Sequence, residues 1–184
     1  MCCVWHVGQF DLTKNKDGPA LATFIFIMLR QASLQELKDH VVTKRHGHLV
    51  MATRYYPRFL SRHDIHEYRS VLGPEKELLD HFKKLDKTLN DHNLAFERAG
   101  YEEKFNLSIA GAAELERLAR LSLDQEVYLI CHCERGQKCH RELLMIMAQE
   151  FFGVSIAPLS NDYPVFRKRF ADAREAIKAQ DAAL

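Results

Sequence analysis

Hydrophobic residues follow two patterns along this chain: short continuous apolar runs, and longer runs with helical spacing. The clearest continuous run is Val127–Cys131, which is bounded by polar residues and predicts a strand buried on both faces. The runs Leu21–Leu29, His48–Thr53 and Val154–Leu159 predict three further strands. Strands that are apolar along their whole length are typical of a parallel sheet covered on both sides.

Helical spacing fills the segments between these runs. Ser33 followed by Glu36 has the pattern of a capping box, which predicts a helix that starts after Ser33 and ends near Gly47. Further helices are predicted from Gly73-Pro74, over Ala113–Leu121, over Arg141–Phe152, and over 166–182. The alternation predicts an α/β fold with a mostly parallel sheet and helices on both faces, in one Rossmann-like three-layer domain. This domain spans 1–184, with a core over about 20–160 and a helical extension over 161–184.

The amino-acid composition limits the classes of molecule that this protein is expected to bind. The chain has 184 residues, of which 47% are hydrophobic and 28% charged, as in a globular domain. The formal net charge of +1 gives no overall field toward nucleic acid or a membrane, so any anion binding must come from a local cluster. The longest apolar run, about Ala20 to Leu29, is far shorter than the roughly 20 residues of a membrane span. We therefore predict no transmembrane segment and no membrane partner.

The cysteine content indicates the redox environment. The chain holds five cysteines: Cys2, Cys3, Cys131, Cys133 and Cys139. The number is odd, and residues 1–9 lack the basic and apolar regions of a secretory signal. Both features predict a cytoplasmic protein whose thiols are free or metal-bound.

The segment Cys131–Arg141 carries the densest chemistry in the chain, with three thiols, two imidazoles and three cationic side chains. It joins the best predicted strand to an apolar helix, at the sheet edge where α/β proteins bind ligands. Free N–H groups at a helix start attract anions and lower the pKa of nearby thiols. The pattern predicts a thiolate–anion site in which Cys133 or Cys139 is the nucleophile and His140 the general acid or base. Arg135 and Arg141 would hold an oxyanion such as phosphate.

Two other interpretations of this segment remain open. One is a zinc-binding structural domain that uses the Cys₃His set of Cys131, Cys133, Cys139 and His140, although the Cys-x-Cys spacing is unusual for a zinc site. Because of this spacing, we rank zinc binding below anion binding for this segment. The cysteines are alternatively small buried core residues. Three of the five cysteines fall within nine residues, however, and this clustering favours a site.

A second basic segment, Arg54–Arg58, follows the strand predicted at His48–Thr53. Arg54, Tyr56 and Arg58 predict a basic and aromatic lip that holds phosphate and stacks on a base. The ligand would be a nucleotide or another phosphate-bearing small molecule, and a non-catalytic module that binds nucleotide or nucleic acid is the alternative. The interpretation without a functional role is a solvent-exposed loop whose tyrosines pack on the core.

These segments together resemble the family called domain of unknown function 488. The resemblance lies in a strand followed by a Cys-x-Cys pair and then Cys139-His140-Arg141, in Arg54–Arg58, and in the helix start at Gly73–Leu79. It covers roughly residues 24–159 and implies an α/β fold with a shared site, without a known reaction. The family usually has Asp-Val-Arg where this chain has Ala52-Thr53-Arg54. If that aspartate transfers protons in the family, another residue must do so here.

Overall fold

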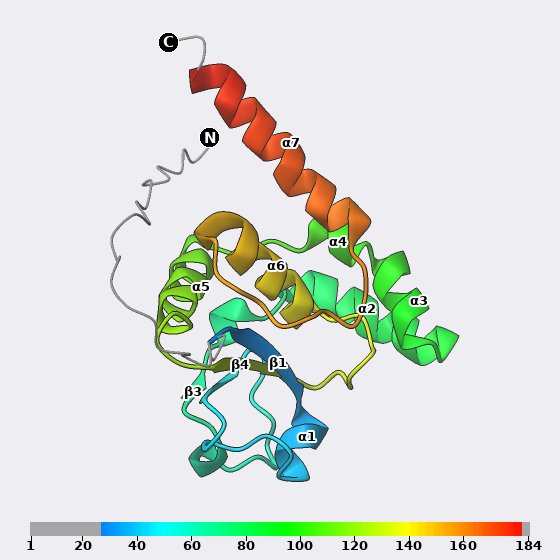
Figure 1. Ribbon diagram of the computed structural model, residues 1–184. Coiled ribbons are helices and arrows are strands. Elements are labelled where there is room, and N and C mark those ends of the chain that lie inside the picture. The colour runs from blue at the N-terminus through cyan, green and yellow to red at the C-terminus, as the bar shows by residue number, and fades with distance from the viewer. Residues whose placement is uncertain (1–26, 182–184) are drawn as a thin grey trace, which may run out of the picture.

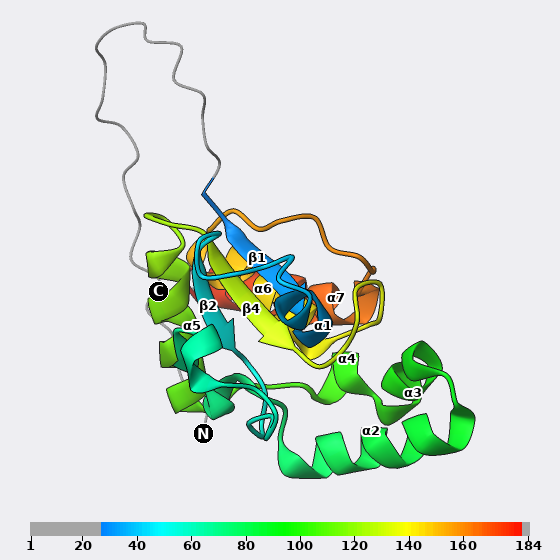
Figure 2. The same ribbon diagram turned by 90° about the horizontal axis from the view of Figure 1, so that it is seen from below.

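The computed structural model describes residues 27–181, and its centre is a parallel sheet. The strands are β1 (Leu29–Ser33), β2 (His48–Met51), β3 (Glu67–Tyr68) and β4 (Val127–Cys131). They lie in the order β1-β4-β2-β3, and every pair is parallel. Ser33 of β1 lies beside Cys131 of β4, so both strands end at the same edge (Figure 2). The predicted α/β class and the predicted strand at Val127–Cys131 are confirmed.

Helices cover the two faces of the sheet unequally (Figure 1). The α-helices are α1 (Leu34–Lys38), α2 (Lys76–Leu89), α3 (His92–Ala99), α4 (Tyr101–Lys104), α5 (Ile109–Leu121), α6 (His140–Phe152) and α7 (Pro164–Asp181); two 3₁₀ turns are η1 (Arg62–Asp64) and η2 (Ser70–Leu72). The larger core lies between the sheet and helices α2 to α7, and the smaller one lies beneath the opposite face with α1. Val127 and Leu129 of β4 face the first core, whereas Ile130 faces the second. This alternation explains why β4 is apolar throughout.

The first described helix begins as predicted and ends early. Ser33 Oγ accepts a hydrogen bond of 3.0 Å from Glu36 N, and Glu36 Oε2 accepts one of 2.7 Å from Ser33 N, which completes the capping box. The helix ends at Lys38, however, and the predicted end near Gly47 is wrong. His40 has a φ of 57°, so the chain turns away and places Val42 in the core below the sheet.

The remaining predicted strands differ from expectation. Leu21–Leu29 lies mostly outside the described residues. Of the segment 154–159, Ile156 alone forms a bridge, parallel to Leu29. Helix α6 ends at Gly153 as predicted, because this residue has a φ of 68°, which glycine adopts readily. Helix α7 matches the predicted C-terminal helix and projects from the body of the protein (Figure 1). Within residues 27–181, no helix has the length and apolar character needed to cross a membrane.

Candidate functional site

Three cysteines converge at the carboxyl end of β4. Cys131 ends the strand, Cys133 lies in the loop that follows, and Cys139 is the N-cap residue of α6. Their Sγ atoms all lie within 4.8 Å of one another, and those of Cys131 and Cys133 are 3.7 Å apart. Cys131 and Cys139 are buried, whereas Cys133 is half-buried. Cys133 is therefore the residue of the three that keeps some exposure.

The imidazole of His140 is held in a fixed orientation toward these sulfurs. The residue is buried at the first position of α6, and its Nε2 lies 2.6 Å from the carbonyl oxygen of Ala52. A carbonyl can only accept, so Nε2 carries a proton and donates it. Nδ1 then faces the cluster, at 3.8 Å from the Sγ atoms of both Cys131 and Cys139. Ala52 directly follows β2, so His140 connects the ends of β2 and β4 at the sheet edge.

The groups of the cluster differ in how their pKa values are shifted. Hydrogen bonds from Cys133 and Cys139, together with the His140 imidazole, hold the pKa of Cys131 well below its usual range. The pKa of Cys133 is raised well above its usual range, because it hydrogen-bonds to Cys131 and Cys139 and is affected by their charge. Burial lowers the pKa of His140, but the charges of Cys131 and Cys139 outweigh it and raise the pKa well above the usual value. Without a metal, the cluster thus favours a Cys131 thiolate beside a protonated imidazole.

Arg141 braces the first half of the loop. The side chain is only 1% exposed, and Nε donates to Gln31 Oε1 at 2.8 Å. Nη1 donates to the carbonyl of Cys133 at 2.6 Å, and Nη2 donates to that of Glu134 at 3.0 Å. The sequence predicted Arg141 as a phosphate clamp. In the structure its guanidinium binds the carbonyls of the protein's own loop, which keeps Cys133 beside Cys131.

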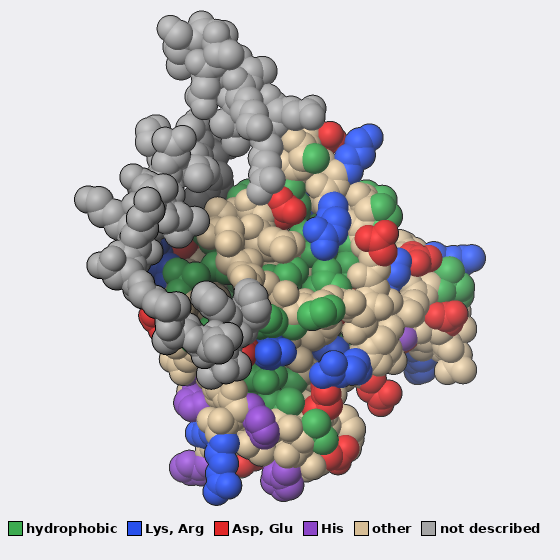
Figure 3. Space-filling view, viewed as in Figure 1, with side chains coloured by type: hydrophobic (Ala, Val, Ile, Leu, Met, Phe, Trp, Pro, Cys, Tyr) green, Lys and Arg blue, Asp and Glu red, His purple; other side chains and the backbone are tan. Residues whose placement is uncertain are grey.

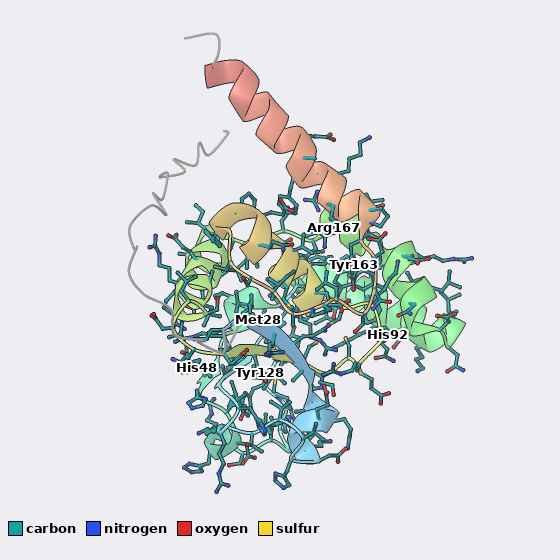
Figure 4. All side chains as sticks on the ribbon, in the orientation of Figure 1. Met28, His48, His92, Tyr128, Tyr163 and Arg167 are labelled. Atoms are coloured by element: carbon teal, nitrogen blue, oxygen red, sulfur yellow. The ribbon has the colours of Figure 1, made fainter. Side chains whose placement is uncertain are left out.

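Glu142 and Tyr163 brace the second half of the loop. The Glu142 carboxylate is fully buried and accepts hydrogen bonds of 2.5 to 3.2 Å from four donors: Gln31 Nε2, Ser160 N, Asn161 Nδ2 and Tyr163 Oη. Tyr163 Oη in turn accepts a hydrogen bond of 2.9 Å from Cys139 N. Tyr163 lies close to the amino end of α6 (Figure 4). Sequence reasoning missed these residues, and the signal that could have found Glu142 was an acidic residue directly before the apolar run Leu143–Ala148.

Further contacts occupy the cationic residues of the loop. Helix α3 holds Lys138: Asn93 Oδ1 accepts from Lys138 N at 2.7 Å, and His92 Nε2 lies 3.1 Å from the Lys138 carbonyl (Figure 4). The Lys138 ammonium pairs with Glu97 at 2.7 Å. Arg135 is exposed and pairs with Glu36 of α1 at 2.6 Å. The three cationic side chains of the segment Cys131–Arg141 are thus all bound within the protein: Arg135, Lys138 and Arg141.

The segment Arg54–Arg58 lies at the same edge but is not joined to the cluster. Arg54 Nη1 donates to the Pro74 carbonyl at 3.3 Å, and Arg54 borders an open groove of about 580 Å³. Arg58 is exposed, and no described residue forms a hydrogen bond or ion pair with it. Tyr56 packs edge-on against Tyr68 at 5.1 Å, and its buried hydroxyl has no partner among the described residues. No hydrogen bond, ion pair or ring contact joins Arg54, Tyr56 or Arg58 to residues 132–139 in the described part of the chain.

The fold and the cluster define an α/β protein with a thiol-rich centre at the carboxyl edge of a parallel sheet. A family model described as the active DUF488-N3 subclade matches residues 33–150, from the start of α1 into α6. The chain therefore belongs to this subclade of the DUF488 family, and the resemblance seen in the sequence is confirmed. The chain has no match among curated proteins or among solved structures.

Proposed function

We propose that this protein is a zinc–thiolate enzyme in which Cys131, Cys133, Cys139 and His140 bind the metal. The observation that carries the proposal is the convergence of three Sγ atoms within 4.8 Å, with His140 Nδ1 at 3.8 Å from two of them. Zn–S bonds of about 2.3 Å in a tetrahedron separate the sulfurs by about 3.8 Å. The 3.7 Å between Cys131 and Cys133 fits this value, and small side-chain movements bring in the remaining ligands.

The surroundings of His140 support its role as a ligand. A metal-bound histidine commonly donates its other ring N–H to a carbonyl or carboxylate, which fixes the ring. The contact of His140 Nε2 with Ala52 O has this form. Two observations favour zinc over an anion at this loop: its cationic side chains are bound within the protein, whereas the three sulfurs lie within 4.8 Å of one another.

Cys133 is the reacting group in this proposal. Zinc keeps a coordinated thiol deprotonated, so Cys133 becomes a thiolate even though its pKa is raised in the absence of metal. Of the three cysteines, it is the one that is half-buried rather than buried. Description of the matching subclade as active agrees with a catalytic role.

Metal analysis of the purified protein tests the zinc site. We expect about one zinc per chain in the wild type, and a loss of at least 100-fold in zinc affinity in Cys139→Ser, because a metal ligand is removed. The double variant Cys2→Ser/Cys3→Ser is the matched control, since it removes two thiols that are not among the proposed ligands, and it should keep its zinc. A wild-type protein that neither contains zinc nor takes it up would refute the proposal.

Binding of a phosphate-bearing ligand along Arg54–Arg58 is a second candidate function. It is favoured by the groove beside Arg54 and by the exposed Arg58, which has no partner among residues 27–181. Figure 3 shows Lys and Arg interspersed with Asp and Glu on the face in view. The net charge of the chain is only +1, so a nucleotide fits this candidate better than a long nucleic acid. Nucleotide affinity that falls with salt and with Arg58→Ala would support it, and affinity unaffected by either would exclude it.

A further inference from the structure

A second groove opens on the face of the sheet that carries α1. It has a volume of about 360 Å³ and lies between α1 with the turn that follows it and the loop that contains η1. Its buried lining residues are Leu37, Val42 and Leu60, which all belong to the smaller core beneath the sheet. None of the residues that line it belongs to the segments 54–58 or 131–141. This groove is therefore separate from both sites proposed above.

The outer lining of this groove is basic. Asp64 is the one acidic residue in the lining. The cations beside the cysteines are bound within the protein, since Arg135 and Lys138 each pair with a glutamate. By contrast, four exposed basic side chains of the groove form no hydrogen bond or ion pair with any residue of the range 27–181: Lys38, His40, Lys44 and His63. The groove thus keeps positive charge that the described part of the protein does not neutralise.

The stretch of chain around the groove concentrates this charge. Between Lys38 and Asp64 the sequence has six Lys or Arg residues and four His, against two Asp and no Glu. The whole chain carries a formal charge of only +1, so the rest of the sequence is net acidic. Figure 3 shows histidine side chains gathered with Lys and Arg at the lower end of the molecule, where α1 lies in Figure 1. A local excess of positive charge attracts small anions.

Phe59 adds an aromatic wall to the groove. This residue is 64% exposed, and Lys38 Nζ lies 4.1 Å from the centroid of its ring. The cation–π contact holds the ammonium group beside apolar surface. Apolar lining with a few polar groups is typical of small-molecule sites, which have volumes of roughly 300–1,000 Å³. The combination fits a ligand that has both a hydrocarbon part and a negative charge.

We propose that this groove binds a small amphipathic carboxylate. The carboxylate group pairs with the ammonium groups of Lys38 and Lys44, and the hydrocarbon chain covers the buried lining residues next to Phe59. Inorganic phosphate lacks the hydrocarbon and a neutral alcohol lacks the charge, so each makes only one of the two kinds of contact. This inference depends neither on the zinc site nor on phosphate binding at Arg54–Arg58.

Three probes test the two kinds of contact separately: octanoate, octanol and inorganic phosphate. Each is titrated into the isotope-labelled full chain, and the shifts of backbone amide signals in NMR spectra map where it binds. We expect octanoate to shift the amides of residues 37–44 and 59–64 in a saturable way. Octanol and phosphate should each bind there at least about 5-fold more weakly, because octanol lacks the ion pairs and phosphate lacks the apolar contact.

Two double variants of equal charge change complete the test. Lys38→Gln/Lys44→Gln should weaken octanoate binding about 5-fold and leave octanol binding within about twofold. The matched control is Lys84→Gln/Lys87→Gln, which removes two exposed lysines of α2 and should keep octanoate affinity within about twofold. All four side chains are exposed, so both variants should fold, which unchanged amide signals away from the substitutions verify. Absence of saturable octanoate binding in the groove, equal affinity for octanol or phosphate, or equal losses in the two double variants would each overturn the inference.

Discussion

Two segments reach the same edge of the sheet, and they are held in very different ways. At the first segment, the loop between β4 and α6, the side chains of Arg141 and Glu142 in α6 are 1% and 0% exposed. Both bind Gln31 of β1. In the segment after β2, Arg58 is exposed and the Tyr56 hydroxyl is buried without a partner among the described residues. The first segment is held by many hydrogen bonds around its thiols, whereas the second leaves Arg58 without a partner among the described residues.

This difference shows where the protein needs a fixed geometry. Two buried charges lose their hydration on folding, and this loss is offset only when hydrogen bonds satisfy them. Arg141 and Glu142 obtain these bonds from β1, from the loop itself, and from the segment that precedes α7. The same bonds hold both ends of the loop, so the convergence of the sulfurs depends on a network that includes none of them.

The largest expected effect comes from Glu142→Ala. This change leaves four buried or half-buried donors without their acceptor, so we expect the free energy of unfolding to fall by about 3–5 kcal/mol. Zinc affinity should fall with it. Glu134→Ala is the matched control: this exposed residue of the same loop should change stability by less than about 0.5 kcal/mol. Urea denaturation of both variants measures the difference, and equal losses would contradict the contrast between buried and exposed positions.

A smaller loss in the free energy of unfolding is expected when the contact between Arg135 of the loop and Glu36 of α1 is broken. Although burial alone would raise it, the pKa of Glu36 lies below its usual value, because the Ser33 backbone and Arg135 bind the carboxylate. A lowered pKa in the folded state gives stability that is present above the unfolded value of about 4.3 and is lost as pH falls through the folded value. Glu36→Gln keeps the cap but removes the charge, so its deficit relative to wild type should shrink below about pH 4.3. Urea denaturation between neutral and acidic pH measures this deficit, and a constant deficit would contradict the assignment.

The smallest effect is expected from Arg58→Ala. This side chain is exposed and forms no hydrogen bond or ion pair with the described residues, so the free energy of unfolding should change by less than about 0.5 kcal/mol. Zinc content and the alkylation rate of Cys133 should also stay the same. A marked loss of zinc in this variant would show that the two segments are coupled, and the comparison between them would fail.

The sequence by itself determined the local elements around the site. The predicted strand at Val127–Cys131 has the same bounds as β4, Ser33 and Glu36 form the predicted capping box, and Gly153 ends α6. These features depend on residues that are close in the chain: a continuous apolar run, a cap, and a glycine with positive φ. The clustering of three cysteines in nine residues likewise marks the candidate site in the sequence alone.

Only the tertiary structure decided what surrounds the thiols. Gln31 and Arg141 lie 110 positions apart in the chain, and their pairing follows from the position of β1 beside β4. Tyr163 meets Cys139 because the segment after α6 returns along the sheet edge. A sequence shows which donors and acceptors exist, but burial and direction decide which of them pair. For this reason Arg141 resembled a phosphate ligand in the sequence, and its contacts made it a brace of the loop.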